Sequence, residues 1–203
     1  MPTIEDLLAR IEQLEARTQA AEDYRALVNL QGAYGYYVDK GQWDKAADLF
    51  AADGTLEIAG RGVYVGQDRV RAYLRHLPPY EYGAIYNHMQ LQPVLHIDSA
   101  AGTAKGRWRT LMMVGWLGKE GRWGEATYEN SYVRETDTSG NAKWRIASLH
   151  GIINFYCEYE EGWHRGGVPL LRSIGGLAPD RPPSLEYEAF PEPVIAPFHY
   201  DEV

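Results

Sequence analysis

A change in hydrophobic period near residue 86 constrains the fold of this chain more than any other feature. Before that point, apolar residues recur at every third or fourth position, as in helices that cover a core. After it, apolar and polar residues alternate, as in strands with one buried face: Met89, Leu91, Leu95 and Ile97 alternate with His88, Gln90, Gln92 and His96. Helices followed by an antiparallel meander predict an α+β fold rather than a parallel nucleotide-binding sheet.

The part before residue 86 contains four expected helical segments. Thr3 has the residue type of an N-cap for the first segment, and Gly41 ends the second. The first has a narrow apolar face, so we expect it to pack on another subunit or on the rim of the sheet. The four segments cover residues 4–14, 24–37, 43–50 and 70–77.

The expected strands come in two groups. A short strand over residues 55–58 turns at Gly60-Arg61-Gly62 into a second strand over residues 63–65. Pro93 cannot donate a ladder hydrogen bond, so the strand that contains it is expected at a sheet edge or with a bulge. Three more long strands, with hairpin turns at 118–121 and 137–141, are predicted over residues 103–116, 122–135 and 143–158.

The last segment, residues 166–203, differs in composition from the rest. It holds seven of the 11 prolines but also many Leu, Ile, Phe and Tyr residues, so it is too apolar for a solvated tail. We expect a Pro-rich arm that packs on the domain, on a neighbouring subunit or over a pocket mouth. The predicted organisation is one domain over residues 1–165, in which residues 1–19 form a helical extension, followed by this arm.

Charge and composition exclude several classes of function. A net charge of −8 and no basic run argue against a nucleic-acid partner. No apolar run is long enough to span a membrane, and no signal peptide is evident. The single cysteine excludes an internal disulfide and a thiolate metal cluster, which fits a cytoplasmic location. The 15 tyrosines and 6 tryptophans suit either a core or a pocket for ring-shaped ligands.

Asp39 and His88 are the candidate catalytic pair. A carboxylate that accepts a hydrogen bond from one imidazole nitrogen leaves the other nitrogen as a general base. For two such residues taken alone, a helix-end carboxylate and a satisfied core histidine are the more common interpretation. The same structural interpretation is given to His96 and His150, and Arg107 with Arg109 is expected to face a subunit interface.

A series of short motifs resembles SnoaL-like proteins of the NTF2-like superfamily. The series is Tyr37-Val38-Asp39-Lys40-Gly41-Gln42, Leu49 to Gly54, Gly60 to Gly66, Asn87-His88, Ala126-Thr127-Tyr128 and Lys143 to Ala147. The resemblance covers about residues 20–157 and is nearest to the hexachlorocyclohexane dehydrochlorinase and scytalone dehydratase branch. It implies a cone-shaped fold in which N-terminal helices pack on a curved antiparallel sheet around an apolar pocket.

The resemblance also implies a site. It makes His88 the base, Asp39 its orienting carboxylate and Tyr34 a third catalytic residue, with no metal and no organic cofactor. The substrate expected is an aromatic small molecule. A homo-oligomer is expected because one face of the sheet, with Arg107, Arg109 and His150, would otherwise face solvent, and the resemblance favours a trimer over a dimer. The substrate-binding residues that it implies are Leu56, Ile58, Tyr86, Trp108, Thr110, Met112, Tyr128, Asn130 and Ile153.

Two departures from the dehydrochlorinase pattern bear on the reaction. Tyr34 and Leu149 stand where that enzyme has the two cationic residues that assist a departing chloride. Without nearby positive charge, a developing halide in an apolar site is poorly stabilised. A tyrosine hydroxyl suits the departure of hydroxide or alkoxide better.

The sequence therefore predicts a cofactor-independent lyase of the dehydratase or deformylating type that acts on an aromatic compound. A narrower possibility is a two-ring, lignin-derived substrate, as for the diarylpropane γ-formaldehyde lyase. The alternative is a non-catalytic binding or interaction domain, because this fold hosts both kinds of function. A third hypothesis, the scaffold subunit of a ring-hydroxylating dioxygenase, is disfavoured by the arm and by the Asp39 and His88 positions.

Overall fold

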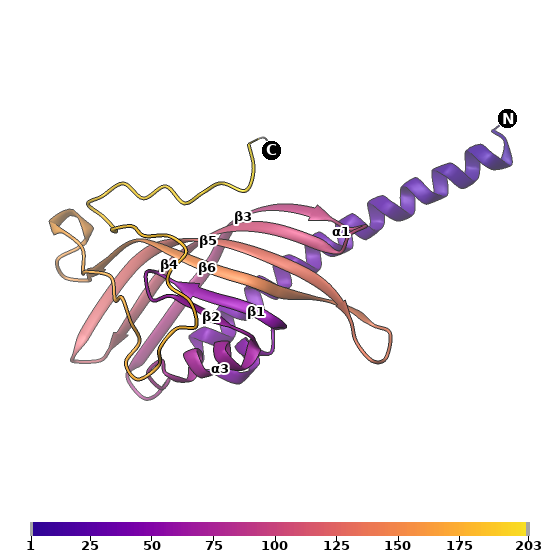
Figure 1. Ribbon diagram of the computed structural model, residues 1–203. Helices are drawn as coiled ribbons and strands as arrows, with labels where there is room; N and C mark the ends of the chain where they lie inside the picture. The colour runs from indigo at the N-terminus through magenta and orange to yellow at the C-terminus, as the bar shows by residue number, and fades with distance from the viewer. Residues whose placement is uncertain (1, 202–203) are drawn as a thin grey trace.

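The computed structural model describes residues 2–201 and confirms an α+β fold built on one curved sheet (Figure 1). The sheet has six strands in the order β2-β1-β6-β5-β4-β3, and helices pack on its concave side. Its strand pairs are antiparallel except β1 with β6, which are parallel, so the sheet is mixed rather than wholly antiparallel as predicted. The elements are α1 (Ile4–Asp39), α2 (Trp43–Ala47), β1 (Phe50–Ile58), β2 (Val63–Val65), α3 (Gln67–Arg75), β3 (Ala84–Asp98), β4 (Thr103–Trp116), β5 (Glu120–Thr136), β6 (Ala142–Glu158) and a 3₁₀ turn (Trp163–Arg165).

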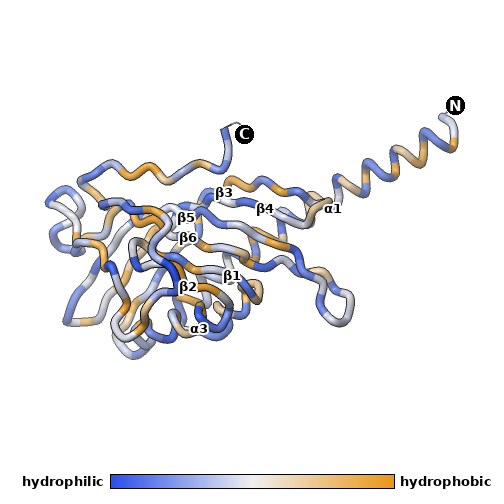
Figure 2. The backbone as a smooth tube through the Cα atoms, viewed as in Figure 1, coloured by the Kyte–Doolittle hydropathy of each residue, from blue (hydrophilic) through white to orange (hydrophobic). Residues whose placement is uncertain are grey.

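Helix α1 is continuous, whereas the sequence predicted two separate helices. The predicted cap is confirmed, because Thr3 and Asp6 form a capping box. The residues between the two predicted segments lack glycine and proline and include good helix formers such as Ala20 and Ala21, so nothing interrupts the helix. Residues 2–22 are exposed and project from the body, with apolar and polar residues mixed along them (Figures 1 and 2). Asp23 is the first buried residue.

The second difference concerns Phe50, which was placed in a third helix but begins strand β1. Helix α2 ends at Ala47, and Phe50 pairs with Ile146 of β6. Pairing with a strand distant in sequence overrides the local helical pattern here. The other strands agree closely with the predictions, and β4 has the predicted bounds.

Pro93 marks a bulge in β3, which is an edge strand, as predicted. The register shifts between Leu91 and Val94, and Gln92 has a φ of 47°. One extra residue in a strand turns every later side chain to the other face. His96 therefore does not share the face of His88; its ring packs against those of His199 and Tyr200.

The Pro-rich arm packs on the domain itself. Its first part, Val168 to Gly175, lines the cavity described below. It is then held by Asp180, 2.9 Å from Nε of Arg69, and by Ser184, which donates to buried Glu57 from its amide (2.8 Å) and its hydroxyl (2.6 Å).

The end of the arm crosses the outer face of the sheet at Arg107. That guanidinium is paired with Glu129, donates to the carbonyls of Ala196 and Pro197, and lies 3.8 Å from the ring centre of Phe198. The placement of Arg107 at a subunit interface stays a prediction; the contacts described here come from its own chain. Among the described residues, no helix is both long and apolar enough to cross a membrane.

Candidate active site

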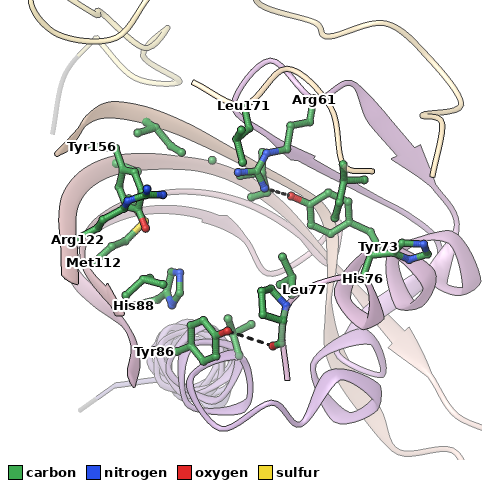
Figure 3. A pocket seen from close by; sticks show the side chains of 18 of the residues that line it. Arg61, Tyr73, His76, Leu77, Tyr86, His88, Met112, Arg122, Tyr156 and Leu171 are labelled. Atoms are coloured by element: carbon green, nitrogen blue, oxygen red, sulfur yellow. Dashed lines mark hydrogen bonds between the residues drawn. The ribbon is translucent and has the colours of Figure 1, made fainter. Parts of the chain in front are cut away.

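A cavity of about 380 Å³ lies between the concave face of the sheet, the helices and the arm. Its volume is in the range of pockets that hold small molecules. Its wall is mainly apolar and aromatic, and Figure 3 shows some of the side chains that form it. They come from all three α-helices, from every strand except β2, and from residues 168–175. An apolar ring system is therefore the kind of ligand that the cavity would accommodate.

Helix α1 approaches strand β3 closely at Gly35. A Cβ atom at this position would lie 2.8 Å from Cγ of Gln90 and 3.1 Å from the carbonyl oxygen of His88, so only glycine allows this separation. Asp39 lies one helical turn further on, on the same side of α1. The close crossing of helix and strand thus brings Asp39 to His88.

Asp39 and His88 are in direct contact. Oδ1 of Asp39 accepts the backbone N–H of His88 at 2.7 Å and lies 3.1 Å from its Nδ1. The carboxylate favours the tautomer with hydrogen on Nδ1, which leaves the lone pair on Nε2. The ring of His88 lies on the cavity wall (Figure 3), so Nε2 is available as a base.

A polar network fixes this part of β3. Gln90 donates to the carbonyl oxygen of His88 at 2.7 Å and accepts from Gln31 of α1 at 2.8 Å. Oε1 of Gln31 in turn accepts from Asn130 (3.0 Å) and from the hydroxyl of Tyr132 (2.9 Å). The backbone that carries His88 is therefore tied to α1 and to β5.

Tyr34 and Tyr128 both line the cavity. Burial, together with the neighbouring tyrosines and Asp39, raises the pKa of both phenols well above the ordinary value. Both hydroxyls therefore stay protonated near neutral pH and can donate a hydrogen bond to an oxygen on a ligand.

The structure separates the predicted site residues into two groups. Seven line the cavity: Tyr34, Ile58, Tyr86, His88, Met112, Tyr128 and Ile153. Asp39 reaches it through His88. Four predicted substrate contacts do not line it: Leu56, Trp108, Thr110 and Asn130.

The reason for this correction is that α1 fills the deeper part of the concave face. Gln31 occupies the space in front of Asn130, whose side chain it bonds. Trp108 donates to the Tyr132 hydroxyl at 2.8 Å, and Thr110 donates to the Met89 carbonyl at 2.7 Å. These side chains face the predicted side of the sheet but lie in the core beneath the cavity.

Several cavity residues were not predicted. Arg61, in the turn after β1, donates to the Tyr73 hydroxyl at 2.6 Å (Figure 3). Arg122, near the start of β5, and Tyr156, near the end of β6, also line the cavity. Burial raises the pKa of Tyr156 to about 12. The sequence predicts a turn at Gly60-Arg61-Gly62 but no role for its arginine. The one feature of the sequence that could have indicated Arg61 is its position between two glycines in that turn. Within residues 2–201, no group of three or more His, Cys, Asp or Glu residues could hold a metal ion.

Comparison with known proteins gives a family match and several similar folds. Residues 19–150 match the family model of the SnoaL-like domain. No curated protein matches the chain. A scytalone dehydratase-like protein from Novosphingobium aromaticivorans is 16% identical with a TM-score of 0.62, covering 78% of this chain and 97% of that one.

Two further solved structures show the same fold. A type 2 hexachlorocyclohexane dehydrochlorinase is 20% identical with a TM-score of 0.60, covering 70% of this chain and 92% of that one. ActVI-ORFA from Streptomyces coelicolor is 15% identical with a TM-score of 0.55, covering 64% and 96%. At these identities the likenesses concern the fold alone.

Proposed function

The chain belongs to the SnoaL-like family, and from this premise we propose that it is a cofactor-independent lyase acting on an aromatic small molecule. The contact between Asp39 and His88 at the wall of an apolar cavity carries the proposal. The folds of the dehydratase-like and dehydrochlorinase structures support it.

In the proposed reaction, Nε2 of His88 removes a proton from carbon. The electrons of the broken C–H bond form a new double bond, and the bond to the leaving oxygen breaks. Asp39 stabilises the imidazolium that forms and holds its orientation. The leaving oxygen is stabilised by the hydroxyl of Tyr34 and takes up the proton, so that water or an alcohol departs and His88 is again neutral.

The cavity volume suits one or two aromatic rings. A second form of the proposal is a deformylating elimination on a two-ring, lignin-derived compound. There Nε2 of His88 takes the proton of a hydroxymethyl O–H, and the C–C bond to that carbon breaks to release formaldehyde. The electrons of that C–C bond form the new double bond, and the leaving oxygen departs with the proton as before. The alternative function, a non-catalytic binding domain, has no need for an imidazole oriented by a carboxylate. The 3.1 Å distance between Asp39 and His88 favours the enzyme.

The bicyclic probe 5-nitrobenzisoxazole tests the base without knowledge of the natural substrate. When a base removes its ring C–H proton, the N–O bond breaks and a coloured cyanophenolate forms. We expect the protein to accelerate this reaction over imidazole buffer, and dialysis against a chelator to leave the rate unchanged. A rate that is lost on dialysis and restored by one divalent metal would contradict the proposal.

A further inference from the structure

Arg61 is a cation on the cavity wall that has no carboxylate partner. Its Nη1 donates to the Tyr73 hydroxyl, its Nε is buried without a hydrogen-bond partner, and no described Asp or Glu lies within 4.0 Å of it. Figure 3 shows its guanidinium between Tyr73 and Leu171, turned toward the cavity.

The other arginine of the wall differs in this respect. Arg122 lies 2.9 Å from Glu120 and 2.8 Å from Glu158, so its charge is compensated within the protein. The side-chain partner of Arg61 is instead the hydroxyl of Tyr73, not a carboxylate.

A guanidinium that is partly withdrawn from water is stabilised by an anion, and its planar fork matches a carboxylate with two parallel hydrogen bonds. Nη2 of Arg61 makes no hydrogen bond to a described residue and, unlike Nε, is not buried, so it is the donor that a carboxylate in the cavity can reach. We propose that Arg61 binds a carboxylate on the aromatic substrate, with the rings of that substrate in the apolar cavity. This inference rests on the proposed function for the reaction, but the binding of the anion does not depend on it.

Binding of 2-naphthoate and of its neutral analogue 2-naphthamide, measured by titration calorimetry on the full chain, tests the inference. We expect the wild type to bind the carboxylate at least tenfold more tightly than the amide. Arg61→Gln should remove this preference while leaving the amide affinity unchanged, and Arg61→Lys should retain part of it. Arg122→Gln is the matched control and should keep the preference.

His88→Gln separates this inference from the proposed lyase function. The carboxylate preference should persist in that variant, even if no catalysis is found in the wild type. Equal affinities for the two probes in the wild type, no binding of 2-naphthoate, or a preference that survives in a folded Arg61→Gln variant would each overturn the assignment.

A second inference concerns the projecting part of α1, which has an apolar stripe but no partner in the chain. Ile4 is 77% exposed, and Leu7, Ile11 and Leu14 are exposed by about half. A row of exposed apolar side chains along a projecting helix is stabilised when a partner covers it.

The spacing of these residues follows a heptad repeat. Ile4 and Ile11 occupy the first position (a), and Leu7 and Leu14 the fourth (d). Isoleucine at a with leucine at d favours a parallel, two-stranded coiled coil.

The flanking charges give the orientation of the partner. Arg10 and Arg17 occupy both of the charged g positions, and Glu15 and Glu22 the charged e positions. In a parallel pair, Arg10 faces Glu15 of the second copy and Arg17 faces Glu22, whereas an antiparallel pair places like charges together. We infer that residues 4–22 form a parallel two-stranded coiled coil with a second copy of the chain, in place of the trimer that the family resemblance implies.

Charge reversal tests this pairing. Arg10→Glu with Arg17→Glu, or Glu15→Arg with Glu22→Arg, should each weaken self-association at least tenfold in sedimentation velocity, and an equimolar mixture should restore the dimer. Ile11→Glu should give monomers, while Ala16→Glu on the outer side of the helix should not. A wild type that is monomeric or contains three chains, or an Ile11→Glu dimer, would overturn the inference.

Discussion

Replacing His88 with glutamine is expected to lower kcat/KM for the opening of 5-nitrobenzisoxazole by about 10²- to 10⁴-fold, the usual contribution of a general base. Glutamine fills a similar space and can keep a hydrogen bond to Asp39, but it has no basic nitrogen. Asp39→Asn should lower the same quantity by about 10²-fold, because an amide in that place no longer stabilises the imidazolium. Absorbance of the cyanophenolate product measures both effects.

His96→Gln is the matched control for this experiment. It makes the same substitution on the same strand, but on the other face, where His96 packs against the end of the arm. Its kcat/KM should equal that of the wild type. A His88→Gln variant that keeps wild-type activity would remove His88 from the reaction.

Replacing Asp23 with alanine is expected to destabilise the fold by about 3 kcal/mol, because it leaves partners of a buried charge unpaired. Asp23 is 3% exposed and accepts from Nε1 of Trp144 at 2.8 Å and from Nη1 of Arg134 at 2.9 Å. For a chain of this size the loss corresponds to a decrease in Tm of roughly 6–12 °C. Thermal unfolding followed by circular dichroism measures it.

The pH dependence of stability is a second test of the contribution of Asp23. Burial by itself would raise the pKa of Asp23, but the hydrogen bonds from Trp144 and Arg134 hold it below the ordinary value. The ionised carboxylate therefore contributes stability that is complete above about pH 4, the ordinary Asp pKa, and is lost as the pH falls below it. The Tm of Asp23→Ala should depend less on pH in that acidic range.

Asp44→Ala is the control for the stability measurement. Asp44 also meets arginines, at 2.8 Å from Arg75 and 3.5 Å from Arg71, but its side chain is 55% exposed. Exposed ion pairs contribute at most about 1 kcal/mol. Equal decreases in Tm for Asp44→Ala and Asp23→Ala would contradict the expectation that Asp23 stabilises the fold through Trp144 and Arg134.

The elements of the fold could largely be predicted because their signals are local. The switch of hydrophobic period identified the helical and strand regions, and the residue types of Thr3 and Pro93 identified a cap and an edge-strand bulge. The errors lie where local signals compete with distant contacts. Phe50 fits a helical stripe, but it joins a strand because Ile146 of β6 pairs with it.

The candidate site shows the same division. The family resemblance placed Trp108, Thr110 and Asn130 at the pocket, and they do lie on the concave face, because the side-chain direction in a strand depends only on neighbouring residues. That direction could not tell that Gln31 of α1 fills the space in front of Asn130, because this depends on how a helix crosses the sheet. The cavity is the part of the concave face that no distant side chain fills.

The sequence alone determined the class of fold, the order of its elements and, through family resemblance, the choice of Asp39 and His88. The tertiary structure decided that these two residues meet, 49 positions apart, because Gly35 lets α1 approach β3. It also placed Arg61 and residues 168–175 at one cavity. Hydrophobic periodicity records which face of each element is buried, whereas a binding site depends on the distances between elements, which only the packed chain fixes.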